Sequence, residues 1–73
     1  MNDFGSRLKE IRKNQGVTQK QVAVAIGASE RGIQNYELNE RKPAFDALIA
    51  LADYFDVSLD YLVGRSDDPR RLP

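Results

Sequence analysis

Two short stretches of helical periodicity meet at a glycine in this chain. From Gln19 to Ile26, and again around Ile33, apolar residues recur at the spacing of a single helix face. Gly27 stands between the two stretches, and glycine accepts the positive φ angle that ends a helix and turns the chain. The sequence therefore predicts two helices joined by a tight turn over residues 19–38.

Capping residues mark where these two helices begin. Thr18 precedes the first helix and Gln21 follows three residues later, which is the spacing of a capping box. Ser29 is expected to cap the second helix. Successive residues of a helix are rotated by about 100°, which divides the second helix into an inward and an outward face. The inward residues are Ile33, Tyr36 and Glu37, and the outward ones are Arg31, Gln34, Asn35 and Leu38.

The flanking sequence predicts three further helices. One begins after an Asp3 cap and ends at Gly16, one follows Pro43, and a short one runs from a Ser58 cap to Gly64. In the first of these helices the apolar stripe is Phe4, Leu8 and Ile11, and the outward basic residues are Arg7, Lys9 and Lys13. The expected core residues of the later two are Phe45, Leu48, Leu51, Ala52 and Phe55, then Leu59, Leu62 and Val63.

Five helices without any strand pattern predict an all-α, compact five-helix domain over residues 1–64. Residues 65–73 are polar and contain two prolines, so we expect them to form a flexible tail. A single domain of 73 residues buries only roughly 60% of its unfolded surface. The core should therefore be small, with no deep substrate cleft.

Composition argues against an enzyme. The chain has no cysteine and no histidine, which removes thiolate and imidazole chemistry and the usual zinc ligands. No metal, cofactor or catalytic residue is expected. There is no signal-peptide pattern and no run of about 18 apolar residues, so we expect a cytoplasmic protein without a membrane partner.

Charge is unevenly distributed, although the net charge is zero. Residues 1–43 contain eight basic and five acidic side chains, whereas residues 44–73 contain three basic and six acidic ones. A basic half that contains the two-helix unit can face phosphate, and the acidic half can face solvent or protein. Two helices joined by a glycine turn commonly serve to place the second helix in the major groove of DNA.

The order and spacing of several motifs extend this interpretation to a family. TQKQVAVAIGAS, IQNYE, RKP and LADYFDVSLDYLVG follow one another over about residues 4–64. In this combination the chain resembles the Xre/Cro-type helix-turn-helix regulators, which include the phage repressors. The resemblance implies a lambda-repressor-like fold that binds a two-fold operator as a homodimer, with residues 30–38 in the major groove and the start of the preceding helix against a phosphate.

The chain departs from the family after Glu37. Many relatives have Arg-Gly-Lys there, whereas this chain has Leu38, Asn39 and Glu40. Asn39 can still adopt the left-handed conformation, so the helix should end in the same way. The loss of two cations is expected to weaken nonspecific affinity and its salt dependence.

Four residues are candidates for contacts with DNA bases. Arg31 can pair with guanine O6 and N7 or bind a phosphate, and Gln34 can read adenine or stay solvated. Asn35 can take a base or a phosphate. Glu30 can accept from cytosine, although its favourable position at a helix N-terminus is the preferred explanation.

The expected contacts to the DNA backbone come from the start of the 19–26 helix and from the loop after residue 37. Gln19 matches the family's glutamine, and backbone N–H groups at the helix N-terminus should reinforce its contact with a phosphate. Solvated loop cations remain the alternative for the basic residues. The candidate backbone contacts are Thr18, Gln19, Lys20, Asn39, Arg41 and Lys42.

Two further sets of residues have structural or assembly roles. Glu37 needs a partner, and Arg12 matches the arginine that pairs with it in phage-repressor relatives. A dimer surface is expected at Tyr54, Tyr61, Leu62 and Leu72, although Tyr61 and Leu62 can instead close the core.

Double-stranded DNA and a second copy of the chain are thus the expected partners, and repression by steric exclusion the expected mechanism. Two alternatives remain open. The chain can be an antitoxin-like or phage-derived module that binds another protein, or the N-terminal DNA-binding part of a longer regulator.

Overall fold

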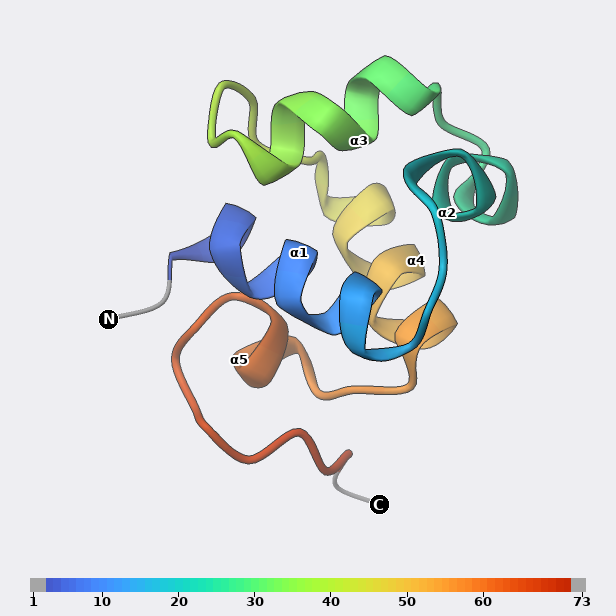
Figure 1. The fold of residues 1–73 in the computed structure, drawn as a ribbon. Coiled ribbons are helices and arrows are strands. Elements are labelled where there is room, and N and C mark those ends of the chain that lie inside the picture. Colours follow the sequence, from blue (N-terminus) through green and yellow to red (C-terminus); the bar gives the residue numbers. More distant parts are fainter. Residues whose placement is uncertain (1–2, 72–73) are drawn as a thin grey trace.

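The computed structural model describes residues 3–71, and these fold into five helices without a strand. Figure 1 shows α3 along one side of the molecule and α5 with the C-terminal segment on the opposite side, with α1 between them. The predicted all-α class and the five helices are confirmed. The helices are α1 (Phe4–Asn14), α2 (Gln19–Ile26), α3 (Glu30–Glu37), α4 (Phe45–Phe55) and α5 (Leu59–Leu62).

Local capping signals place most of the helix boundaries. The side chains of Asp3, Ser29 and Ser58 accept from the backbone N–H three residues ahead, and Thr18 forms both hydrogen bonds of a capping box. Gly27 ends α2 with a φ of 73°. The exception is α4, which begins two residues after Pro43 behind an Ala44 cap that makes no side-chain hydrogen bond. Pro43 is therefore outside the helix.

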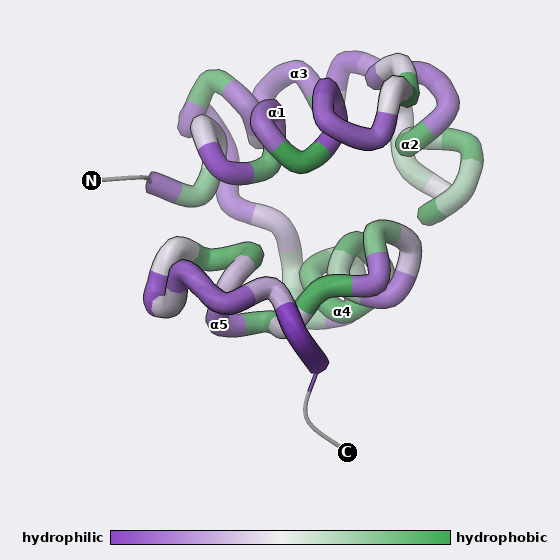
Figure 2. The backbone as a smooth tube through the Cα atoms, turned by 60° about the horizontal axis from the view of Figure 1, so that its bottom comes forward, coloured by the Kyte–Doolittle hydropathy of each residue, from purple (hydrophilic) through white to green (hydrophobic). Residues whose placement is uncertain are grey.

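Every helix contributes buried side chains to the core. Figure 2 shows α1 and α3 as mostly hydrophilic tubes with apolar interruptions, whereas α4 is largely hydrophobic. Side chains from α1 to α5 and from the α4–α5 turn meet in one cluster, and Leu8, Val22, Ile33, Leu51 and Leu62 have no exposed surface.

Three predicted core residues lie outside this cluster. Phe45 is 73% exposed, Leu59 is 42% exposed, and Val63 is half-buried at the C-terminal end of α5. Phe45 and Leu59 are each the first residue of a helix, and a helical side chain leans back toward the N-terminus. At a first position there is no preceding turn for the side chain to cover, so it projects past the core.

Gly5 allows the start of α1 to approach the end of α3. A Cβ atom at Gly5 would lie 2.5 Å from the Glu37 carbonyl oxygen and 2.7 Å from that of Tyr36. Asn39, in the left-handed conformation at φ 60°, accepts a 3.0 Å hydrogen bond from the Gly5 N–H through its Oδ1. The α3 C-terminus is thereby fixed against α1.

Replacing Gly5 with alanine should destabilise the domain by about 1–3 kcal/mol, because the two opposing carbonyls belong to backbone and cannot rotate away. Alanine is intrinsically the better helix former, so any net loss measures the clash. Thermal unfolding followed by circular dichroism tests this, with Ser6→Ala as the matched exposed control. Equal Tm values for both variants would contradict the close approach.

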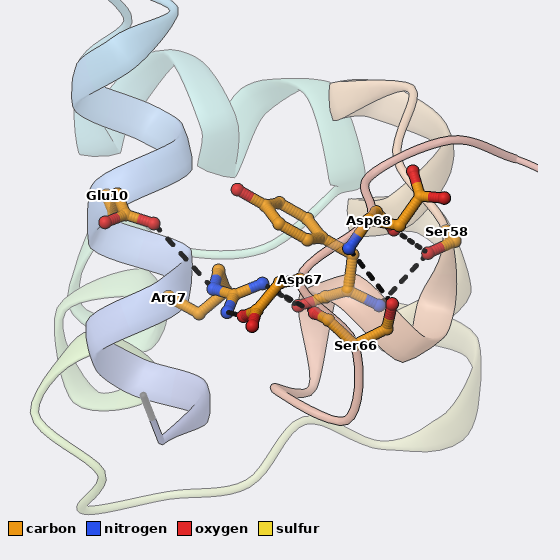
Figure 3. A network of polar contacts seen from close by, with 7 residues as sticks. Arg7, Glu10, Ser58, Ser66, Asp67 and Asp68 are labelled. Carbon is orange, nitrogen blue, oxygen red and sulfur yellow. Dashed lines mark hydrogen bonds and ion pairs between the residues drawn. The ribbon is translucent and has the colours of Figure 1, made fainter. Parts of the chain in front are cut away.

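Arg7 was expected to face outward, and this is wrong. Its side chain is 3% exposed and runs from α1 into the space between α5 and the C-terminal segment, as Figure 3 shows. Nη1 donates to the carbonyls of Tyr61 at 2.8 Å and Ser66 at 3.1 Å, and Nη2 to Asp67 at 3.2 Å. The guanidinium also lies 4.0 Å from the Tyr61 ring centroid. Arg7 flanks the apolar stripe of α1, and residues distant in sequence, from α5 and the C-terminal segment, cover its side chain.

Residues 65–71, expected to form a flexible tail, run back along α5 and the end of α4. The Ser58 N–H donates to the Pro69 carbonyl at 2.9 Å, and Arg71 forms ion pairs with Asp53 and Asp56. The Arg70 side chain donates to Asp68 and lowers the pKa of that carboxyl to about 2. Residues 65–71 are therefore held against α4 and the α4–α5 turn.

Candidate nucleic-acid interface

The outer face of α3 carries polar side chains that form no hydrogen bond or ion pair within residues 3–71. Arg31 and Gln34 are exposed, and Asn35 is half-buried. Glu30 is exposed in the first turn of α3, where its charge suits the positive end of the helix. On the opposite face Ile33 and Tyr36 are buried against the core, so the outer residues are displayed at fixed positions.

Helix α2 packs on α3, and a capping box closes its N-terminus. Gln21 accepts from the Thr18 N–H at 2.7 Å, while Thr18 Oγ1 accepts from the Gln21 N–H at 3.0 Å. The Thr18 hydroxyl hydrogen takes no part in this pair and can still be donated. Lys20 is exposed in the first turn of α2.

A buried network joins α1, α2 and α3 behind this surface. Arg12 donates to Glu37 through Nε at 2.6 Å and through Nη2 at 3.1 Å, so the predicted ion pair is formed. Arg12 also donates to the Val17 carbonyl at 3.1 Å. Gln19 Nε2 donates to Glu37 Oε1 at 3.1 Å. The sequence predicts only a phosphate contact for Gln19 and does not indicate this second one, which fixes the side chain and leaves its other amide hydrogen available.

The loop between α3 and α4 carries the remaining candidates. Arg41 and Lys42 are exposed. Asn39 is also a predicted contact to the DNA backbone, and its Oδ1 accepts from the Gly5 N–H at 3.0 Å. The pKa of the nearby Asp3 carboxyl is lowered mainly by the Ser6 backbone N–H and next by the Asn39 side chain. The structure therefore gives the Asn39 amide an internal role.

Cationic side chains near α3 and in the C-terminal segment differ in whether they form ion pairs. Within residues 3–71 the exposed cations of α2, α3 and the α3–α4 loop form no ion pair; these are Lys20, Arg31, Arg41 and Lys42. The three arginines of the C-terminal segment each have an internal partner: Arg65 with Asp60, Arg70 with Asp68, and Arg71 with Asp53. Lys9 and Lys13 of α1 are also exposed without an ion pair, so four of the six free cations within residues 3–71 lie on α2, α3 and the α3–α4 loop, although the chain is neutral overall.

The predicted dimer residues have different environments. Leu62 has no exposed surface, so it cannot offer contact area to a partner, and it belongs to the core. Tyr61 is half-buried beneath the Arg7 guanidinium. Tyr54 is 37% exposed and packs edge-on against Phe55. Leu72 lies outside the described residues.

Two other kinds of site find no support in residues 3–71. No three acidic side chains are grouped closely enough there to hold a metal ion. None of the five helices has the length and apolar character needed to cross a membrane.

The capped α2 and α3, joined at Gly27 and backed by three further helices, define a helix-turn-helix domain. A family model described as helix-turn-helix matches residues 8–62. The chain is 41% identical over 66 residues to YobD, an uncharacterized HTH-type transcriptional regulator of Bacillus subtilis (strain 168), and 40% identical over 64 residues to ImmR, an HTH-type transcriptional regulator of the same organism. These matches cover 90% and 88% of this chain but only 59% and 50% of those relatives.

A solved structure has the same fold. The P22 c2 repressor, crystallised with a synthetic operator, superimposes with a TM-score of 0.85 at 27% identity, covering 90% of this chain and all of that one. The chain belongs to the Xre/Cro-type helix-turn-helix family of transcriptional regulators. The resemblance inferred from the motifs is thereby confirmed.

Proposed function

We propose that this chain is a double-stranded DNA-binding domain of a transcriptional regulator, with α3 in the major groove. The observation that carries the proposal is the concentration of unpaired cations and free polar side chains on α3 and its neighbours. The P22 c2 repressor, with the same fold, was crystallised on operator DNA, which supports this use of the surface.

Base recognition is assigned to the exposed first turns of α3. The planar guanidinium of Arg31 can donate two parallel hydrogen bonds to guanine O6 and N7. Gln34 and Asn35 follow on the same side of the helix, and their amides suit adenine N6 and N7. Glu30 is the remaining candidate, as an acceptor for the cytosine N4 amino group.

Backbone recognition is assigned to the α2 N-terminus and to the loop between α3 and α4. At the α2 N-terminus, Thr18, Gln19 and Lys20 present a hydroxyl, an amide and an ammonium beside free backbone N–H groups. On the other side Arg41 and Lys42 supply two cations. Contacts on both sides of the reading helix would fix its register without reading sequence.

We further propose that the regulator binds a palindromic operator as a homodimer and represses by excluding polymerase. Two-fold half-sites on one side of DNA lie about 34 Å apart, one helical turn. The domain measures 30 × 24 × 24 Å, each dimension being smaller than that separation, so two copies fit side by side on adjacent half-sites without overlap. Tyr54 is the exposed candidate for the contact between them.

Selection of duplexes from a random library by the purified chain at about 0.15 M salt tests the proposal directly. We expect enrichment of a palindrome with fixed half-site spacing. A folded protein that enriches no sequence would defeat it and favour a module that binds another protein.

Alanine variants separate the two kinds of contact. Arg31→Ala should cost about 1–3 kcal/mol in binding and relax one base position, whereas Lys42→Ala should weaken all sequences alike and reduce the salt slope by about one. Arg65→Ala is the matched control, since it also removes one exposed arginine but from the opposite end of the domain. Unchanged base preference in Arg31→Ala would show that the reading face is assigned wrongly.

A further inference from the structure

Leu38 is an apolar side chain on the polar face of α3. It is 58% exposed, whereas the other large apolar residues of the helix are buried, with Ile33 at 0% and Tyr36 at 9%. A single exposed leucine is common on protein surfaces. The position of Leu38 distinguishes it, because that position belongs to the surface proposed above to read DNA.

The backbone continues the helix through Leu38. Its φ and ψ are −87° and 0°, and its N–H donates to the Gln34 carbonyl at 3.0 Å. Residues separated by three, four or seven positions lie on one side of a helix. Leu38 is therefore in line with Arg31, Gln34 and Asn35.

The major groove offers one apolar feature for such a side chain. Of the groups that the four base pairs expose there, only the thymine 5-methyl group is apolar. Arg31 and Leu38 are seven residues apart, which is about 10 Å along the helix at 1.5 Å per residue. That length corresponds to about three base pairs at 3.4 Å each.

We propose that Leu38 determines specificity by contacting the methyl group of a thymine that lies within about three base pairs of the base read by Arg31. This inference rests on the proposed function. It also gives a physical role to the departure at position 38, where many relatives have an arginine. In this chain a side chain that could bind the DNA backbone through its positive charge is replaced by one that makes an apolar contact with a base.

The test removes the methyl group without changing base pairing. In the selected operator each thymine is replaced in turn by deoxyuridine, and the dissociation constant is measured at fixed salt. Burial of one methyl group changes an equilibrium by about fourfold, so one position should show a loss of that size with the unaltered protein. Leu38→Ala should bind thymine and deoxyuridine equally at this position, while Leu38→Met should keep the discrimination.

Val24→Ala is the matched control, because Val24 is also an exposed apolar residue, 74% exposed on α2. Its discrimination should equal that of the unaltered protein. Leu38 fills no space in the core, so Leu38→Ala should keep its Tm.

Three results would overturn the inference. If the unaltered protein binds thymine and deoxyuridine equally at every position, Leu38 reads no methyl group, although the proposed function stands. If Leu38→Ala still discriminates, another residue makes the contact. If no duplex is selected at all, both this inference and the proposed function fail.

Discussion

Replacing Arg12 with alanine should lower the free energy of unfolding by about 3–5 kcal/mol, because it leaves a buried carboxylate without its counterion. The side chain of Glu37 is 3% exposed and that of Arg12 is 13% exposed. Two charged hydrogen bonds and the Val17 contact would be lost at once. Gln19 would remain as a partner for Glu37 in this network, and a neutral amide cannot compensate a full negative charge.

Urea unfolding measures this loss, with Lys13→Ala as the exposed neighbouring control. Replacing both partners, as in Arg12→Met with Glu37→Leu, removes the stranded charge and should recover much of the stability. A loss below about 1 kcal/mol in Arg12→Ala would mean that the pair behaves as a surface pair.

The Arg12 variant also bears on how binding data are interpreted. The same network holds Gln19 at the α2 N-terminus and the end of α3. Arg12→Ala should therefore weaken DNA binding without touching DNA. Binding must be compared at a temperature where each variant is folded.

Sequence reasoning succeeded where the determining interactions are local. The caps at Asp3, Thr18, Ser29 and Ser58, and the turn at Gly27, depend on residues within four positions of each other. The buried stripes of α1 and α3 follow from periodicity in the same way. The exposure of Phe45 was missed because periodicity assigns a face to a residue but does not say whether the neighbouring element reaches that end of the helix.

The contacts that the sequence could not predict at the candidate site join distant residues. Asn39 bonds to Gly5, 34 positions away, and Gln19 to Glu37, 18 positions away. Leu62 was weighed as both core and dimer surface, and only the packing of α5 on α1 and α4 decides for the core. One signal was available for Arg7: it lies three residues after Phe4 and four before Ile11, on the flank of the apolar stripe.

The buried position of Arg7 leads to the second large effect. Arg7→Met keeps a long side chain in place but removes the donors to Tyr61, Ser66 and Asp67. Leaving a buried carbonyl without a donor costs about 1–3 kcal/mol. The Ser66 carbonyl can regain water if the segment moves, so we expect a loss of about 2–3 kcal/mol in all, or a Tm lower by roughly 10–20 °C.

Hydrogen exchange can distinguish release of residues 65–71 from general loss of stability. The Ser58 N–H donates to the Pro69 carbonyl, whereas the Ile33 N–H donates to Ser29 within the α2–α3 region. Arg7→Met should speed exchange at Ser58 more than at Ile33, because the segment that covers Ser58 has lost its attachment to α1. Arg65→Met serves as the control, since Arg65 is 78% exposed and its ion pair with Asp60 is long, at 3.9 Å. Equal acceleration at both amides would mean that Arg7 stabilises the whole domain and does not specifically hold the segment.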